Sequence, residues 1–254
     1  MRSLKRADAI ITICPALQEQ VQRTAPWAME KHQLIENSIF EDVRMAQPAT
    51  AQTNPATAGT AADSASMQAS DYSDGLASVV YAGTLEAYQG IDLLLDAIAL
   101  LVKQRSDFKV IIAGGRADQV DNFKARSSEL GITEHCTFLG QILPKQARDL
   151  ASSATIILSP RSNGTNTPLK TYEQLACGVP LIATDIYSHT QVLDESLALL
   201  VPPSADGLAQ GIQTLLDDPQ MGQSMVTKAQ AHYEEFYSRP AYLRKLKALF
   251  ELVA

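Results

Sequence analysis

A run of hydroxyl and amide side chains between Ser162 and Thr167 is the part of this sequence best suited to hold an anion. The run is followed by Pro168 and by an apolar-periodic segment, residues 169–176, that predicts a helix. Backbone amides and short hydroxyls at the start of a helix bind phosphate groups, because the helix dipole is positive there. We therefore interpret residues 159–185 as a strand end, a phosphate-binding loop, a helix and a second strand. The alternative is an ordinary crossover with a polar loop.

Four charged side chains could complete such a site. Glu173, on the predicted helix, carries a carboxylate that can accept both hydrogen bonds of a vicinal diol, as recognition of a ribose requires. Lys170 lies on the same helical face, where it either neutralises a diphosphate or pairs with Glu173. Arg161 and Arg116 are further cations that follow predicted strands. Taken singly, each arginine is expected to be solvated.

Several other chemistries lack their motifs. No G-x-G-x-x-G follows Val80, and neither a phosphate-binding P-loop nor a G-x-S-x-G nucleophile elbow occurs. No two carboxylates are placed as a glycosidase pair. The four histidines are scattered, and only His189 lies near the proposed site, where we interpret it as a solvated loop histidine.

Composition narrows the class of protein. The 254 residues are 46% hydrophobic and 19% charged, so the chain can bury a core, and the net charge of −7 argues against a nucleic-acid partner. The three cysteines are widely spaced, which indicates free thiols in a reducing cytoplasm and no metal site. No apolar run approaches the roughly 20 residues of a membrane span, and the first residues make no convincing signal peptide. We expect a soluble, intracellular α/β protein.

The elements that would position the site alternate between apolar strands and amphipathic helices. This alternation predicts a doubly wound parallel sheet, with ligands at the carboxyl ends of the strands. The expected strands are residues 76–82, 108–113, 136–139, 154–158, 179–183 and 197–201. The expected helices are residues 91–104, 118–130, 145–152, 169–176, 205–216, 220–237 and 241–253. Loops at 83–90, 114–116, 138–141 and 161–167 should then converge on one edge of the sheet.

The chain divides into four parts by composition. Residues 1–45 hold a strand, a helix and a second strand without a complete domain, so we interpret them as the remnant of an N-terminal domain. Residues 46–75 are almost entirely small and polar and are predicted to be a disordered linker or insertion. Residues 76–218 form the predicted α/β domain, and residues 219–254 are predicted C-terminal helices.

The order of the strand-end motifs carries a resemblance. GTLEAYQG, IIAGG, FLGQI and YEQLACGVPLIATD follow one another along the chain. This set resembles the family-4 (group 1) retaining glycosyltransferases, whose GT-B fold has two Rossmann-like domains facing a cleft. The resemblance covers their C-terminal, nucleotide-sugar-binding domain at about residues 78–218 and continues into the final helices. Residues 8–38 are similar to the segment that ends the N-terminal domain of these enzymes.

The resemblance implies roles for individual residues. Glu173 matches the second glutamate of the family's E-x7-E motif, which binds the donor ribose, while Thr165 stands where the first glutamate is expected. Residues 166–170 (NTPLK) resemble a variant loop of the superfamily, and Thr84 and Gln89 replace the arginine and lysine that bind the diphosphate. The negative charge of the diphosphate would then be compensated by the helix N-terminus together with Lys170, Arg161 or Arg116. The implied catalytic residues are Lys170 and Thr165, and the implied donor-binding residues are Gly83, Thr84, Arg116, Leu139, Arg161, Gly164, Asn166, Thr167, Lys170 and Glu173.

The implied activity is hexosyl transfer from a nucleoside-diphosphate sugar with retention, without a cofactor or an obligate metal. The implied partner is a missing N-terminal acceptor domain or subunit, without which we expect no activity. The implied location is the cytoplasm, with peripheral association at the inner membrane through the absent half as an option. Two alternatives stay open. One is a non-catalytic nucleotide-sugar-binding or interaction module, and the other is an epimerase, which needs an acid/base pair that the sequence does not reveal.

Overall fold

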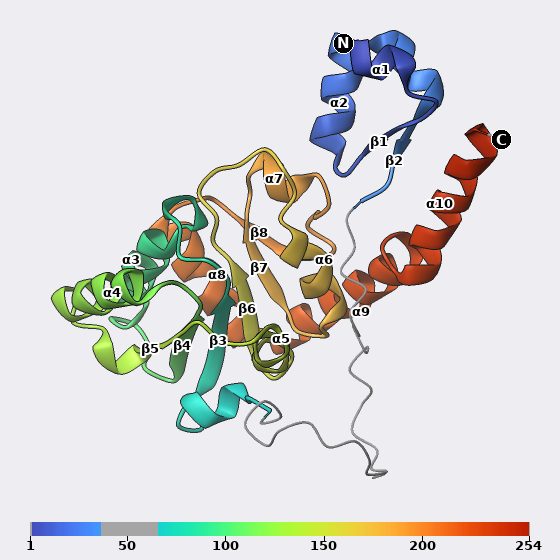
Figure 1. Cartoon of the computed structure of the whole chain (residues 1–254). Helices are drawn as coiled ribbons and strands as arrows, with labels where there is room; N and C mark the ends of the chain where they lie inside the picture. Colours follow the sequence, from blue (N-terminus) through green and yellow to red (C-terminus); the bar gives the residue numbers. More distant parts are fainter. Residues whose placement is uncertain (1, 37–65, 254) are drawn as a thin grey trace, which may run out of the picture.

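The computed structural model describes residues 2–36 and 66–253, which form a small N-terminal unit and a larger α/β domain (Figure 1). The N-terminal unit contains a pair of parallel strands, β1 and β2, in which Ile10 lies opposite His32. Ile10, Ala25 and Ala28 are buried between its helices and strands. Its elements are α1 (Arg2–Arg6), β1 (Ile10–Thr12), α2 (Pro15–Thr24), η1 (Pro26–Lys31) and β2 (His32–Leu34).

The α/β domain is built on a parallel sheet of six strands in the order β5-β4-β3-β6-β7-β8. The chain builds outward from β3 to β5, crosses back, and builds outward again from β6 to β8. The strand order therefore reverses between β3 and β6, which confirms the predicted doubly wound sheet. The strands are β3 (Ala77–Ala82), β4 (Phe108–Ala113), β5 (Cys136–Gly140), β6 (Ile156–Ser159), β7 (Leu181–Thr184) and β8 (Leu199–Val201).

Helices cover both faces of this sheet. Successive residues of a strand point to opposite faces, so Val79 and Tyr81 pack into one core and Val80 packs into the other. The first core is closed by α3 (Ile91–Leu101), α4 (Ala117–Glu129) and α8 (Ala205–Asp217). The second core is closed by α5 (Pro144–Ser152), α6 (Leu169–Ala176) and α9 (Pro219–Phe236). Strands that are buried on both faces explain the continuous apolar runs in the sequence.

Helix α6 begins at Leu169, as predicted. Pro168 is the residue that precedes it, at φ −65° and ψ 132°, and lies outside its first turn. A short helix that the sequence did not predict, α7 (Tyr187–Thr190), follows β7. The last helix, α10 (Arg239–Val253), extends away from the domain beside the N-terminal unit (Figure 1). An ion pair between Lys245 and Glu36 joins these two segments.

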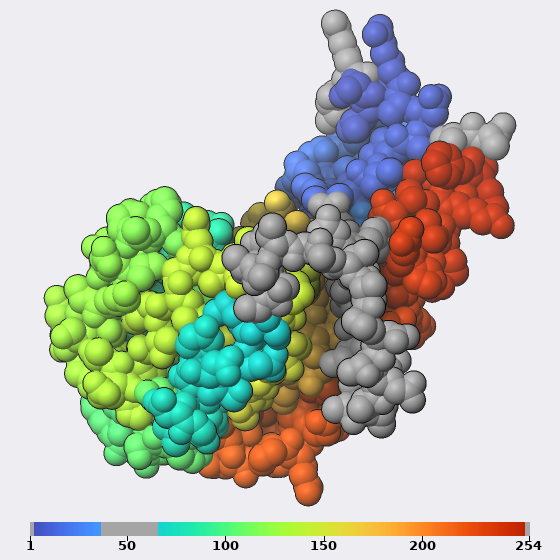
Figure 2. All heavy atoms as spheres, turned by 60° about the horizontal axis from the view of Figure 1, so that its bottom comes forward, coloured from blue at the N-terminus to red at the C-terminus, as the bar shows by residue number. Residues whose placement is uncertain are grey.

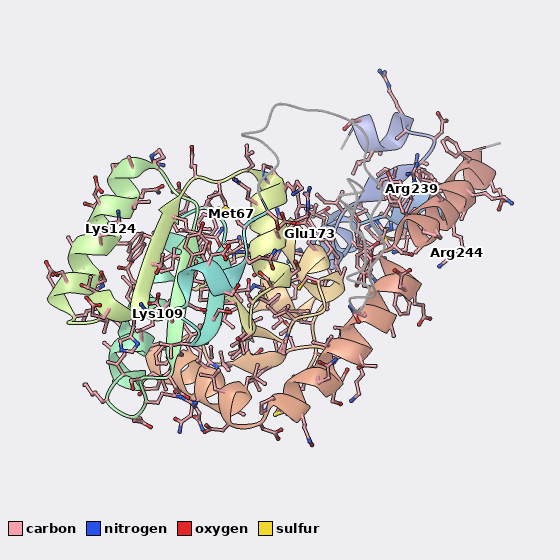
Figure 3. The ribbon with its side chains drawn as sticks, turned by 90° about the horizontal axis from the view of Figure 1, so that it is seen from below. Met67, Lys109, Lys124, Glu173, Arg239 and Arg244 are labelled. Atoms are coloured by element: carbon pink, nitrogen blue, oxygen red, sulfur yellow. The ribbon has the colours of Figure 1, made fainter. Side chains whose placement is uncertain are left out.

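Part of the segment 46–75, predicted to be a disordered linker or insertion, is ordered and packed onto the domain. Residues 69–72 form the 3₁₀ helix η2 (Ala69–Tyr72), the backbone N–H of Ala69 donates to Ser153 Oγ at 2.9 Å, and Ala69 is fully buried. Asp74 pairs with Lys109 at 2.6 Å, and Lys109 is labelled in the view from below (Figure 3). Figure 2 shows this cyan segment lying against the domain. Residues 46–65 of the predicted linker lie outside the described residues.

The carboxyl ends of the strands point toward the side on which the N-terminal unit lies (Figure 1). The backbone N–H of Ala16, at the start of α2, donates to Gln191 Oε1 at 2.7 Å, and the Tyr187 hydroxyl donates to Glu19. The two units thus meet beside the edge where a ligand of a doubly wound sheet is expected. None of the helices in residues 2–36 and 66–253 combines the length and apolar character that a bilayer span requires.

Candidate functional site

The loops that follow β3, β4, β5 and β6 meet at one edge of the sheet, as predicted. The backbone N–H of Gly83 donates to the carbonyl of Ala113 at 2.9 Å, and that of Gly114 donates to Gly140 at 2.6 Å. The backbone N–H of Ser162 donates to the carbonyl of Tyr88 at 2.9 Å. These bonds continue the sheet's pairing beyond the strand ends and hold the loops against one another.

Two glycines make this close approach possible. Gly90 has φ +74°, and a Cβ at this position would lie 1.9 Å from the carbonyl oxygen of Pro160. Gly114 has φ +115°, and a Cβ there would lie 1.9 Å from the carbonyl oxygen of Gly83. Any side chain at either position would both strain the backbone and collide with the neighbouring loop. The site therefore depends on bare backbone at two of its loop contacts.

Lys170 places a buried ammonium group at the point where the strand order reverses. Its Nζ lies 4.3 Å from the centroid of the Tyr81 ring and has no hydrogen-bond acceptor within the described residues. A Cβ on Gly83 would be 3.1 Å from Nζ, so the loop after β3 also borders it. Burial, aided by the nearby Arg161, lowers the pKa of Lys170 to about 7. A buried cation without an acceptor is unfavourable, so this position favours an anion from outside the chain.

Arg161 is the second cation at this point. Its guanidinium stacks over the Tyr88 ring at 4.9 Å and donates to the carbonyls of Asn163 at 2.8 Å and Asn166 at 3.4 Å. Within the described residues no carboxylate pairs with it. Its positive charge contributes to the lowered pKa of Lys170. Two neighbouring cations that lack a carboxylate partner make this edge electropositive.

Arg116 differs from these two cations. It pairs with Glu86 at 3.3 Å and with Asp118 at 3.2 Å, and these carboxylates raise its pKa. Its charge is already balanced by the protein, so we do not assign it to the same anion. The resemblance placed Arg116 among the donor-binding residues, and the structure places it at the start of α4, on the rim of a neighbouring pocket.

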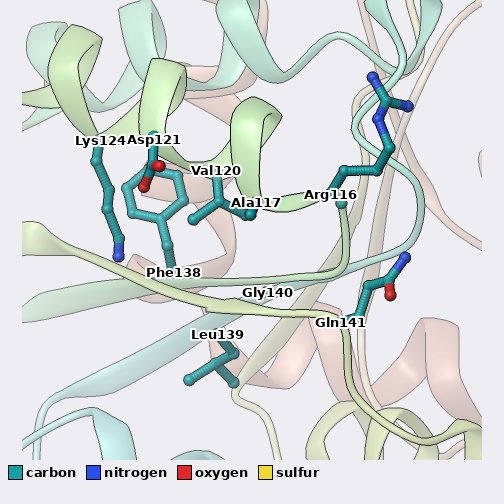
Figure 4. A pocket seen from close by; sticks show the side chains of 10 residues that line it. Arg116, Ala117, Val120, Asp121, Lys124, Phe138, Leu139, Gly140 and Gln141 are labelled. Atoms are coloured by element: carbon teal, nitrogen blue, oxygen red, sulfur yellow. The ribbon is translucent and has the colours of Figure 1, made fainter.

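That pocket, of about 410 Å³, lies between the start of α4 and the end of β5 (Figure 4). Phe138 points toward α4, whereas the side chain of Leu139 points to the other face of the sheet, so only the backbone of Leu139 is free to face a ligand (Figure 4). The walls combine apolar side chains with the bare backbone of Gly115 and Gly140. A flat, partly polar ring would suit such a pocket.

The loop at 162–167 is held by polar contacts with its carbonyl groups. Arg161 binds those of Asn163 and Asn166, and Gln191 Nε2 donates to the carbonyl of Thr165 at 2.6 Å. Thr165 and Asn166 are exposed, and Thr167 is half-buried in front of α6. Gly164 has φ +147°, and a Cβ there would lie 2.7 Å from Arg161 Cζ, so the loop wraps closely around this arginine.

Glu173 is half-buried on α6 (Figure 3). Burial raises the pKa of its carboxyl, and Arg148 opposes this rise. It forms no ion pair with Lys170, so the sequence alternative in which the two side chains merely neutralise each other is not seen. Thr84 and Gln89 do contact each other, at 3.2 Å, in the loop after β3.

His189 is not the solvated loop histidine that the sequence predicted. It is fully buried, with Nε2 2.9 Å from Ser159 Oγ and Nδ1 2.8 Å from the carbonyl oxygen of Thr184. Burial lowers its pKa to about 4, and Lys170 and Arg161 contribute to the shift. The neutral ring therefore ties β6 to β7 beneath the site.

Sequence reasoning missed three side chains at this edge. Tyr81 carries the ring beneath Lys170, Tyr88 stacks on Arg161, and Gln191 holds the loop. Tyr81 is an apolar-strand residue by pattern, and only its alternation with Val80 and Ala82 indicates which face it occupies. Nothing local marks Tyr88 or Gln191.

Comparisons with known proteins match this arrangement. The family model described as "Glycosyl transferases group 1" matches residues 65–232. The chain is 31% identical over 166 residues to the D-inositol 3-phosphate glycosyltransferase of Jonesia denitrificans, covering 62% of this chain and 39% of that protein. It is 30% identical over 146 residues to the phosphatidyl-myo-inositol mannosyltransferase of Mycolicibacterium smegmatis, covering 57% of this chain and 37% of that protein. The chain thus spans less than half the length of these relatives.

Two solved structures share the fold. Anabaena Alr3699/HepE, in complex with UDP, has a TM-score of 0.75 at 16% identity, covering 98% of this chain and 65% of that one. The sucrose-phosphate synthase of Thermosynechococcus elongatus has a TM-score of 0.72 at 23% identity, covering 98% of this chain and 59% of that one. Both are GT-B proteins, so the fold expected from the resemblance is confirmed.

Proposed function

Because this chain belongs to the group 1 glycosyl transferases and has their GT-B fold, we propose that it is the donor-binding half of a retaining hexosyltransferase that uses a nucleoside-diphosphate sugar. Membership in this family supports glycosyl transfer as the reaction, and transfer by this protein is part of the proposal. The donor class, the stereochemical outcome and the role of each residue are our proposal.

One observation carries it. Among residues 2–36 and 66–253, Lys170 Nζ is buried without an acceptor, beside an Arg161 that has no carboxylate partner, where the strand order reverses. A diphosphate supplies the missing negative charge and several acceptor oxygens at once. Its binding would restore the charged form of Lys170, which burial disfavours in the free protein.

The rest of the donor is assigned to the neighbouring features. The pocket between α4 and β5 suits the nucleobase, with the backbone at Leu139 and Gly140 available to read its edge. Glu173 is assigned to the ribose diol. Gly83 and Thr84 border the diphosphate from the loop after β3, and the loop residues Gly164, Asn166 and Thr167 border it from the other side. Thr165 would face the transferred sugar.

In this proposal the chain's chemical task is electrostatic. As the bond between the sugar and the diphosphate breaks, negative charge grows on the leaving oxygens. Lys170 and Arg161 would stabilise that charge from fixed positions, which needs no reorganisation during the reaction. The carboxylates of Glu86, in the loop after β3, and Asp118, in the first turn of α4, pair with Arg116, so we assign neither of them to a double displacement. We assign the acceptor to a second half that faces this edge. That half would be an N-terminal domain or partner subunit, and any peripheral membrane contact would belong to it.

The first experiment is calorimetric titration of the full chain with UDP, GDP and ADP and then with their sugars. UDP comes first because Alr3699/HepE is described in complexes with UDP and with UDP-glucose. We expect one diphosphate to bind, and we expect Lys170→Met and Arg161→Ala each to weaken binding by about tenfold or more. Lys103→Met, at an exposed position just past the end of α3 and outside the proposed site, is the matched control and should bind normally. If none of the three nucleotides binds the unaltered chain, the donor site is wrong.

A second candidate is a non-catalytic nucleotide-sugar-binding module. It is favoured by Thr165, which lacks the carboxylate of the family motif, and by Thr84 and Gln89, which contact each other instead of supplying cations. Mixing the chain with the N-terminal half of a relative and following hydrolysis or transfer of a bound sugar separates the two. Tight binding without turnover under these conditions supports the module.

A further inference from the structure

The side-chain amide of Gln191 connects two segments that are far apart in the sequence. Its Oε1 accepts a hydrogen bond from the backbone N–H of Ala16 at 2.7 Å, and its Nε2 donates to the carbonyl of Thr165 at 2.6 Å. Gln191 directly follows α7 and is half-buried. Each end of one rigid amide group therefore has a partner, one in the N-terminal unit and one in the loop after β6.

Both partners need this contact. Ala16 lies in the first turn of α2, where backbone N–H groups have no acceptor inside the helix, and the residue before the helix, Cys14, provides no side-chain cap. Gln191 supplies the missing acceptor from outside. On the other side, Thr165 lies in an exposed loop whose neighbouring carbonyls, at Asn163 and Asn166, are held by Arg161. Gln191 holds the carbonyl between them.

The same interface contains a natural reporter. The Cys14 side chain is 2% exposed, and its Sγ lies 4.0 Å from Asn166 Oδ1. The hydroxyl of Tyr187 donates to Glu19 nearby. If the N-terminal unit moved away from the domain, the Cys14 thiol would become accessible, whereas Cys136 and Cys177 lie within the domain and would not change.

We propose that Gln191 is a positioning residue that links the docking of the N-terminal unit to the conformation of the loop at 162–167. The link rests on the proposed donor site, since that loop would border the nucleotide sugar. Because one amide serves both partners, each bond helps to hold the amide in the orientation that the other bond needs, so the loss of one bond weakens the other. Nucleotide bound at the loop would thereby favour the docked position of the N-terminal unit.

The two ends of the amide can be tested separately. Gln191→Leu removes both bonds, and Gln191→Glu keeps the acceptor for Ala16 while replacing the donor to Thr165 with a carboxylate oxygen. Docking is read from the rate at which a maleimide labels Cys14, with Cys136 and Cys177 quantified in the same digest as references. Loop conformation is read from amide hydrogen exchange in the peptide that contains residues 162–167.

We expect Gln191→Leu to raise both the Cys14 labelling rate and the loop exchange by about fivefold or more. Gln191→Glu should raise the loop exchange while leaving the Cys14 rate within about twofold of that of the unaltered chain. Gln220→Leu, at an exposed position of α9, is the matched control and should change neither. Unchanged exchange in β3 shows that each variant is folded.

The proposal is overturned if Gln191→Leu changes neither readout, or if the Glu variant alters both equally. A final arm adds UDP, which should slow Cys14 labelling in the unaltered chain by about fivefold and should have no such effect in Gln191→Glu. If UDP does not bind at all by calorimetry, the proposed function fails, while the measurements made without nucleotide still decide whether Gln191 links the two segments.

Discussion

Lys170 Nζ lies 4.3 Å from the centre of the Tyr81 ring, and no acceptor in the described residues binds it. The ring offers the ammonium group a weak attraction through its π face, which replaces only part of the hydration that burial removes. The Tyr81 hydroxyl turns away and donates to the carbonyl of Thr84 at 2.6 Å. This relationship makes Lys170 costly for the free protein and useful for binding an anion.

Lys170→Met should therefore stabilise the free protein while removing its nucleotide affinity. Methionine has a similar length and no charge to desolvate, so we expect the free energy of unfolding to rise by about 1–3 kcal/mol. Nucleotide binding should weaken by about tenfold or more because a charge-assisted bond is lost. Thermal unfolding and calorimetry with UDP measure the two effects. A destabilised variant with unchanged UDP affinity would show that Lys170 is structural.

Nucleotide-sugar affinity should fall as the pH rises above neutrality. The pKa of Lys170 is lowered to about 7, so the amine is mostly charged below this pH and mostly neutral above it. The anion binds the charged form, and at higher pH a proton must be taken up on binding. Affinity for UDP-glucose should then fall by up to about tenfold per pH unit above pH 7. His189, with a pKa of about 4, stays neutral throughout this window.

The proton uptake can be measured directly. Calorimetric titrations at pH 8 in two buffers of different ionisation enthalpy should give different apparent binding enthalpies. Lys170→Met should bind weakly, with no pH trend across the same range. An affinity of the unaltered chain that stays flat between about pH 6 and about pH 9 would contradict the assignment of Lys170 to the anion.

Glu173→Ala should weaken nucleotide binding with little change in melting temperature. The carboxylate is half-buried, and burial raises its pKa because the charged form is desolvated. Removing the carboxylate therefore removes a desolvation cost from the free protein. The loss should be specific to the ribose. The variant should bind UDP about tenfold more weakly than the unaltered chain does. For 2′-deoxy-UDP, which lacks one ribose hydroxyl, the substitution should cause a smaller loss of affinity. Equal losses for the two nucleotides, or a large drop in melting temperature, would remove Glu173 from the ribose site.

Gly90→Ala should disrupt the site through the backbone. The substitution forces a left-handed conformation on alanine and drives its Cβ into the carbonyl oxygen of Pro160. We expect a loss of more than about 3 kcal/mol in the free energy of unfolding. Gly131→Ala is the matched control, since Gly131 has φ +69° but no atom of the described residues lies within 4 Å of the added Cβ. This substitution should lower the free energy of unfolding by about 1–2 kcal/mol, which is the cost of the left-handed backbone conformation alone. Chemical denaturation of both variants provides the comparison.

Much of the framework could be predicted because its signals are local. The helix at residues 169–176 has the predicted bounds, since Pro168 marks its start and Cys177 with Gly178 marks its end. The strand at residues 108–113 also has the predicted bounds, because an apolar run that ends at two glycines needs no distant information. Parallel strands joined by helices place their loops at one edge, so the convergence of these loops followed from the order of elements.

The segment at 66–75 shows where such reasoning stops. Its small polar composition predicts disorder, yet Ala69 is buried against Ser153 and Asp74 pairs with Lys109. A methyl group fills a gap between elements that are distant in the sequence, and composition carries no information about that gap.

The alternation of strands and helices and the turn-rich loop of the candidate site can be read from the amino-acid sequence, because hydrophobic period, capping residues and turn residues act over a few neighbours. The role of each polar side chain depends on the folded protein. The fold buries His189 between β6 and β7 and balances Arg116 with Glu86 and Asp118. It also leaves Lys170 over Tyr81 without an acceptor among the residues that the structure describes. The charge and protonation of a side chain depend on burial and on partners brought from other strands, and these are set only when the sheet has closed.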